Sequence, residues 1–200
     1  MAINWSRHPP KLSWLKQGDR LLPASDDWDK AVTFSPHGFD RFVHIWSGYV
    51  RAGDALVDAA ERQSVDRHFL VYPILFNYRH GLELAIKWII EQYGAYVEVH
   101  LDANDRNHDL WNLWKLCKQV LIEIGGERIG SEGLAAVEQI VKDFHDIDKS
   151  GVAFRYSRNK DGATIQLPKT PVDLLHIQQV MEGVDNFFTG ADGVLWAALP

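Results

Sequence analysis

The chain has little cysteine and no long apolar run. Cys117 is the only cysteine among its 200 residues, which excludes an intramolecular disulfide and any cysteine-rich zinc site. No apolar segment approaches the ~20 residues of a membrane span, and residues 1–10 lack the apolar core of a signal peptide. We therefore expect a cytoplasmic protein without a membrane partner. Since Cys117 falls among apolar residues, we expect it to pack as a small hydrophobe.

Basic residues are also scarce relative to acidic ones. The chain has 21 Lys and Arg against 27 Asp and Glu, a formal net charge of -6. Binding along a nucleic-acid backbone depends on accumulated positive charge, so this balance excludes a protein whose main function is to coat nucleic acid. It still allows a local basic patch.

The nine histidines do not form a known metal-binding motif. The chain contains no H-E-x-x-H, no H-x-x-x-H and no Glu-x-x-His pair. The histidines leave open only a scattered metal site, for example His44, His80 and His145 from three helices. We expect neither a metal nor a cofactor.

Hydrophobic periodicity predicts an all-α fold. We expect an up-and-down bundle of about five helices with minimal sheet, and a long irregular loop, about 146–169, before the last helix. The bundle spans residues 36–190, between an N-terminal arm at 1–35 and a tail at 191–200. Its helices are expected at about 36–63, 65 or 67 to 93, 108–124, 131–144 and 170–188.

The arm contains three prolines and three tryptophans, and we expect Trp5, Trp14 and Trp28 to pin it to the bundle.

Local signals place the ends of these helices. Gly94 is expected as a left-handed C-cap, followed by a short extended piece at 96–99. The N-caps are expected at Asn107 or His108 with Asp109 in the first turn, at Ser131, and at Thr170 with Asp173 as an acidic third position.

Polar side chains interrupt the apolar second helix at Asn77, Arg79, His80, Glu83, Lys87 and Glu91, and four of them form a stripe. His80, Glu83, Lys87 and Glu91 fall within an arc of about 80° on a helix that turns ~100° per residue. Such a stripe is either a solvated face opposite the core or part of a cleft. If it is buried, the charged groups must pair, because an unpaired buried charge is very unfavourable.

The loop before the last helix places aromatic rings among cations. Its candidate residues are Phe154, Arg155, Tyr156, Arg158 and Lys160. Aromatic rings can stack on bases while cations neutralise phosphates. Alternatively, Arg155 reaches back to Glu83, and the two aromatic residues plug the bundle.

The order of these segments resembles the HEPN superfamily, helical nucleotide-binding and RNA-cleaving domains of bacterial toxin and phage-defence systems. The resemblance covers about residues 65–188. It lies in His80-Gly-Leu-Glu83-Leu-Ala-Ile-Lys87 on a long helix, His108-Asp109-Leu110 opening the next, and Phe154-Arg155-Tyr156 before the last. It implies the fold, a homodimer, and binding of nucleotide or RNA.

One motif departs from that family. Active HEPN ribonucleases carry an Arg, four to six residues and then a His near a late helix, where two subunits form a composite site. Here, Arg62 and His68 have this spacing but lie between the first two helices, which puts ribonuclease activity in doubt. Any such enzyme would be metal-independent.

These observations define a candidate site. We expect His80, Glu83 and Arg155 as its catalytic residues, with Glu83 orienting His80 or Arg155. Nucleotide or RNA would contact Lys87, His108, Tyr156, Arg158 and Lys160. The alternative is a non-enzymatic accessory module, in which these residues form a structural network and the arm recruits a protein partner.

Overall fold

The computed structural model describes residues 13–22, 24–101 and 108–199 and divides the chain into two units, residues 1–35 and 36–200. The first unit is the segment expected to form an arm. Its described part contains no helix or strand. Trp14 and Trp28 are exposed, and Trp5 lies outside the described residues. That the tryptophans pin the arm to the bundle stays a prediction.

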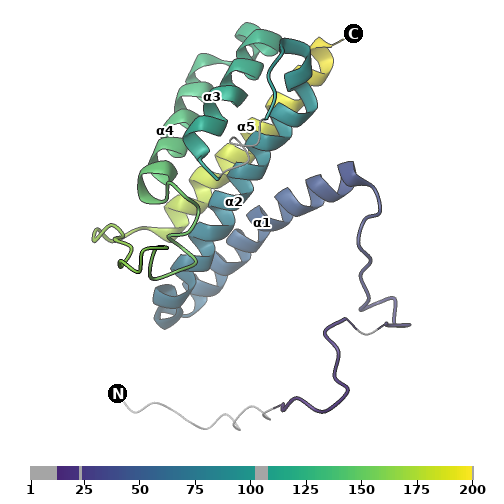
Figure 1. The fold of residues 1–200 in the computed structure, drawn as a ribbon, viewed down its shortest axis with the longest axis vertical. Helices are drawn as coiled ribbons and strands as arrows, with labels where there is room; N and C mark the ends of the chain where they lie inside the picture. The colour runs from purple at the N-terminus through teal and green to yellow at the C-terminus, as the bar shows by residue number, and fades with distance from the viewer. Residues whose placement is uncertain (1–12, 23, 102–107, 200) are drawn as a thin grey trace. The chain divides into compact units, whose positions relative to one another are not determined.

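The second unit is a helical bundle, which confirms the predicted all-α fold (Figure 1). The described residues form no sheet, and a single antiparallel bridge pairs Arg158 with Thr164. The five helices are α1 (Gly38–Arg62), α2 (Arg67–Tyr93), α3 (Leu110–Val120), α4 (Ser131–Ile147) and α5 (Leu174–Ala198). Within the described residues, no helix is both long enough and apolar enough to span a bilayer.

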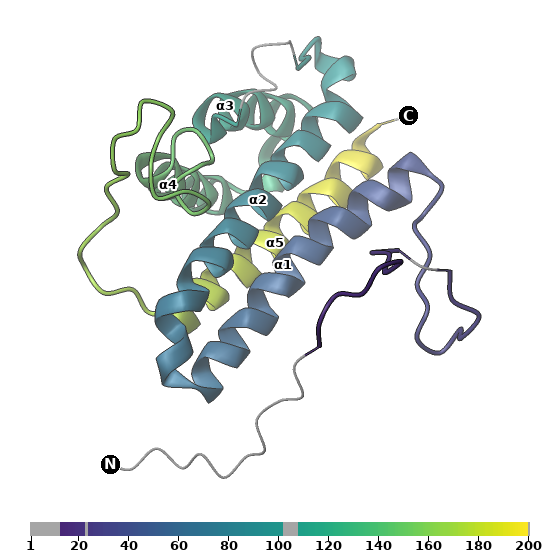
Figure 2. The same ribbon diagram turned by 60° about the horizontal axis from the view of Figure 1, so that its bottom comes forward.

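Helix α2 is the centre of the bundle, as its apolar circumference predicts. It packs against α1, α3 and α5 (Figures 1 and 2). Many of its apolar residues are buried, among them Ile74, Leu82, Ile86 and Ile89. Cys117 of α3 is buried in the same core, where burial raises its pKa, so its predicted role as a small hydrophobe is confirmed.

The direction of the helices alternates except between α2 and α3. Helix α3 begins beside the middle of α2, because His108 hydrogen-bonds to Glu83. It leads to a turn in which Gly125 lies against Leu195, near the end of α5. Helix α3 therefore runs in the same direction as α2, and its first residues lie next to the polar stripe of α2.

Several helix ends differ from the prediction. Asp109 is itself the N-cap of α3, where it accepts a hydrogen bond from the Asn112 amide, and Asn107 lies outside the described residues. Asp173, rather than Thr170, caps α5, and Ser131 is the first residue of α4 without a capping bond. Helix α5 continues to Ala198, so the expected tail at 191–200 is mostly helical.

Gly94 also serves a purpose different from the one predicted. Its backbone is right-handed and begins a 3-10 turn, Gly94–Val97, that replaces the expected extended piece; the left-handed residue is Glu98. A Cβ atom on Gly94 would lie too close to the carbonyl oxygen of Val99, whose amide donates to the Gly94 carbonyl. Glycine is thus needed for a close backbone approach.

We expect Gly94→Ala to lower the free energy of unfolding by about 1–3 kcal/mol, because backbone atoms must shift to admit the methyl group. Urea denaturation measures the change. Gly183→Ala is the matched control, since Gly183 is an exposed residue inside α5 with open space around it. That substitution should stabilise the protein slightly. Equal effects at the two positions would contradict the close approach at Gly94.

Candidate functional site

The polar stripe of α2 contains a buried carboxylate with three partners, two cations and an imidazole. Glu83 is 1% exposed. Its Oε1 lies 2.7 Å from Lys87 Nζ and 2.8 Å from His108 Nδ1, and its Oε2 lies 3.2 Å from Arg79 Nη1. Burial disfavours the ionised carboxylate, but Lys87 and His108 outweigh it and hold the pKa of Glu83 below its ordinary value. The stripe is therefore not a solvated face along its whole length. Glu83 is buried, whereas Glu91 is exposed to solvent.

Arg79 joins this carboxylate to two other segments of the chain. Its guanidinium is buried, and Nη2 donates to the carbonyl oxygens of His108, at 2.6 Å, and Asp148, at 3.1 Å. Its Nε lies 3.5 Å from the Asp148 carboxylate, which also accepts a hydrogen bond from the Val152 amide. One side chain of α2 thus holds both the start of α3 and the loop after α4.

Gly151 allows that loop to approach the guanidinium. Its φ is +72°, and a Cβ atom there would lie 3.0 Å from Arg79 Nη1 and 3.1 Å from His108 Cβ. A side chain at this position would need both a left-handed backbone and space that the two neighbours occupy. The loop is therefore shaped to lie directly on the Arg79 and His108 pair.

His108 forms a carboxylate–imidazole pair with Glu83. Its Nδ1 faces Glu83, while the side chain is 51% exposed. A carboxylate at Nδ1 favours the tautomer with its proton on that nitrogen, which leaves Nε2 to accept a proton from a ligand. This arrangement suits a general base or a hydrogen-bond acceptor. His108, rather than the predicted His80, is therefore the histidine that Glu83 contacts.

His80 is held by aromatic rings. It stacks on Phe76 with a centroid distance of 5.7 Å and meets Tyr49 edge-on at 4.5 Å. Burial lowers the pKa of His80, Glu83 opposes that effect, and the neighbouring cations reinforce it. This lowering favours the neutral form of the ring. His80 lies near the Glu83 cluster without a hydrogen bond to that carboxylate in the described structure.

Arg155 does not reach Glu83, so the contact considered as an alternative in the sequence is not formed. Its Nε and Nη2 donate to the Gly151 carbonyl oxygen, at 2.9 and 2.6 Å. The exposed guanidinium lies 5.5 Å from the Phe76 ring and 5.4 Å from the Tyr156 ring. A pocket of about 420 Å³ adjoins these residues and is lined by Tyr72, Phe154 and Tyr156 among others. Arg155 therefore belongs to an exposed aromatic surface.

The other two candidate cations of the loop, Arg158 and Lys160, lie apart from the cluster. Arg158 Nη1 reaches the carbonyl of Gly162 within a short hairpin, and Lys160 is exposed in the same turn. Nothing in the described part of the chain links either residue to Glu83 or His108. The structure thus brings together Glu83, Lys87 and His108. It places both His80 and Arg155 against the Phe76 ring, and it leaves Arg158 and Lys160 outside the cluster.

Two members of the cluster, Arg79 and Asp148, are missing from the predicted site. Arg79 precedes Glu83 by four residues, the spacing at which helical side chains meet, and this signal could have identified it. Asp148 carries no comparable signal, because its approach depends on how the loop folds back onto α2.

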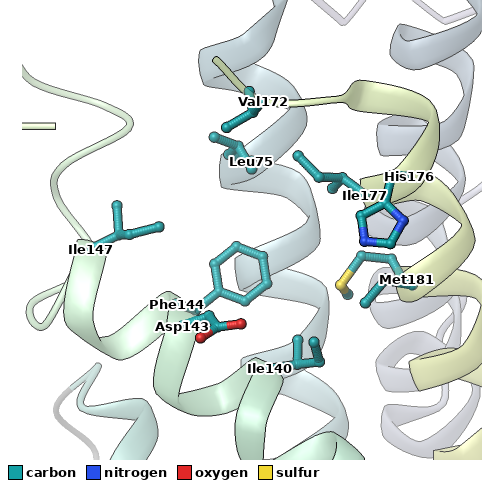
Figure 3. A pocket seen from close by; sticks show the side chains of 10 residues that line it. Leu75, Ile140, Asp143, Phe144, Ile147, Val172, His176, Ile177 and Met181 are labelled. Atoms are coloured by element: carbon teal, nitrogen blue, oxygen red, sulfur yellow. The ribbon is translucent and has the colours of Figure 1, made fainter. Parts of the chain in front are cut away.

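A second pocket, between α2, α4 and α5, has a different character (Figure 3). It has a volume of about 190 Å³, and apolar side chains such as Leu75, Phe144 and Met181 line most of it. Asp143 and His176 are its ionisable residues. It offers no cluster of cations for a phosphate.

The scattered metal site is not formed. Among the described residues, no three His, Cys, Asp or Glu side chains gather where they could hold a metal ion, and this includes His44, His80 and His145.

No protein-family model, curated protein or solved structure matches the chain. Its function must therefore be inferred from the geometry of the cluster.

We expect acid to destabilise the wild type more than Glu83→Gln. Because the pKa of Glu83 is lower in the folded than in the unfolded chain, its stabilising effect is present above the unfolded pKa of about 4.3. That effect disappears as the pH falls through the lower folded value. Urea denaturation at a series of pH values from about 6 to about 3 measures this loss, which should be smaller in the variant. Glu91→Gln, an exposed position on the same helix, should keep the wild-type pH dependence. The same dependence in both variants would contradict the pairing of Glu83.

Proposed function

We propose that the protein binds RNA or a nucleotide on a surface formed by His108, His80, Arg155 and Tyr156, hereafter the His108–Arg155 face. The observation that carries this proposal is the exposed His108 imidazole, oriented by a buried carboxylate and adjacent to the loop that carries Arg155. Gly151 links the two, since it lies against His108 and accepts both hydrogen bonds from Arg155.

The side chains of this face suit a phosphate and a base. Arg155 supplies a permanent cation whose remaining N–H donors are not used by its two hydrogen bonds to Gly151, and Lys87 adds a partly buried positive charge beside Glu83. Tyr156 is exposed beside the guanidinium and offers a ring for stacking. Such an exposed cation and ring are typical of single-stranded RNA binding. Recognition would depend on this local patch, because the chain as a whole is acidic.

The proposed activity is binding, and cleavage of the bound RNA would be an additional activity of the same residues. If RNA is cleaved, His108 is the residue placed to remove a proton from an attacking hydroxyl, and Arg155 to stabilise the phosphate. The HEPN-like relationship, a homodimer, and a role in bacterial defence or a toxin–antitoxin-like system belong to the same proposal.

The alternative is a non-enzymatic interaction module. Its support is that the three charged residues that are buried in the described part of the chain, Arg79, Glu83 and Asp148, are all paired with one another or with backbone. Such pairing is what stability alone requires of buried charges. In this case, the cluster only stabilises the fold, and the N-terminal arm recruits a protein partner.

We expect Arg155→Ala and His108→Ala each to weaken binding of a short single-stranded RNA by about tenfold, because each removes a direct ligand contact. Fluorescence anisotropy at a fixed, low salt concentration measures the change. The matched controls are Lys115→Ala and His44→Ala, which remove an exposed cation and an exposed histidine from α3 and α1. Both controls should bind RNA as the wild type does.

Thermal denaturation of the same variants separates binding from folding. RNA affinity that is unchanged in Arg155→Ala and His108→Ala would contradict the proposal. The alternative then gains support if deletion of residues 1–35 abolishes assembly with a protein partner, while Arg155→Ala lowers only the melting temperature.

A further inference from the structure

A second site lies where α2 and α5 end, formed by aromatic side chains around one carboxylate. Trp88 and Tyr93, both buried, come from α2, Tyr96 comes from the following turn, and Asp192 and Trp196 come from α5. These residues line a pocket of about 590 Å³. None of them belongs to the His108–Arg155 face.

Asp192 is fixed by the aromatic residues around it. Its Oδ1 accepts hydrogen bonds from Trp88 Nε1, at 2.9 Å, and from the Tyr93 hydroxyl, at 2.8 Å. Within the described residues, its second carboxylate oxygen, Oδ2, has no hydrogen-bonding partner. Burial, together with the nearby Asp192, raises the pKa of Tyr93, so the phenol stays neutral and keeps its donated hydrogen bond.

The outer walls are aromatic and open to solvent. Trp196 is 77% exposed and Tyr96 is 63% exposed. A tryptophan this exposed contributes little to the core and so has no evident purpose in folding. In a pocket that also contains a fixed negative charge, exposed indole and phenol rings provide the electron-rich faces that attract cations.

We infer that this aromatic pocket binds an alkylated ammonium group, with the rings of Tyr96 and Trp196 around the cation and Asp192 as its counter-charge. A quaternary ammonium has no N–H to donate, so a site for it needs aromatic faces and a negative charge rather than a set of acceptors. The net charge of -6 favours approach of a cation over an anion. The same head group occurs in free small molecules and in methylated lysine side chains.

Isothermal titration of the full chain with choline tests this inference, and 3,3-dimethylbutan-1-ol, its uncharged carbon isostere, is the matched ligand. We expect choline to bind with a dissociation constant of about 1 mM or tighter, and the isostere at least about fivefold more weakly. A parallel titration with trimethyl-lysine amide identifies the source of the head group, since the tighter of the two cations is closer to the natural ligand.

Two substitutions localise the binding. Trp196→Ala removes an exposed ring and Asp192→Asn removes the charge while keeping a hydrogen-bond acceptor, so both should fold, and each should weaken choline binding at least about fivefold. Trp28→Ala is the control, because Trp28 in the arm is also 77% exposed. It should leave the affinity unchanged.

Equal affinity for choline and its isostere would overturn the inference, since the pocket would then be an apolar patch. Absence of heat with both cations, or wild-type affinity in Trp196→Ala, would overturn it as well. None of these results bears on RNA binding by the His108–Arg155 face, so the two proposals fail independently.

Discussion

The guanidinium of Arg79 is the constraint on which the rest of the site depends. A buried cation must find partners within the protein, and Arg79 finds them on three segments: Glu83 on its own helix, the His108 carbonyl before α3, and Asp148 after α4. Those contacts explain why α3 begins beside the middle of α2 and why the loop carrying Gly151 lies so close to it. They also place the His108 imidazole against Glu83 and leave its outer edge in solvent. The exposed imidazole is thus positioned by a buried interaction.

The sequence predicts the helices well and their ends less well. Apolar spacing places four of the five helices within a few residues of their observed bounds, because burying one face determines where a helix lies. Helix α5 is longer than predicted. Gly190 and Gly193 weaken its helical signal after Phe188, but burial of Ala191 and Leu195 against the bundle outweighs that local preference. The predicted N-cap of α5 is wrong for a related reason. Thr170 and Asp173 are both residue types that cap helices, and the tertiary path of the chain determines which of them does so.

The sequence indicates which residues belong to the candidate site better than it indicates which of them contact one another. The stripe, the start of α3 and the aromatic loop are all visible as polar or cationic interruptions in the sequence, and the structure brings the first two into direct contact. The sequence does not show which side chains contact Glu83, because residue spacing identifies contacts only between residues of the same helix. Arg79 is available by that rule, whereas the choice of His108 over His80 and Arg155 depends on how loops return to α2. The aromatic pocket joins residues that are about a hundred positions apart, so no local pattern could indicate it.

Amide hydrogen exchange in Arg79→Lys tests the central claim most directly. Lysine keeps a positive charge beside Glu83 but lacks the planar fork that binds two carbonyl oxygens at once. If one guanidinium fixes both segments, exchange should become at least about tenfold faster in residues 109–113 and in residues 148–156 together, with the amides of α1 unchanged. Protection that is retained in both segments, or lost in only one of them, would show that α3 and the loop are held against α2 by other contacts.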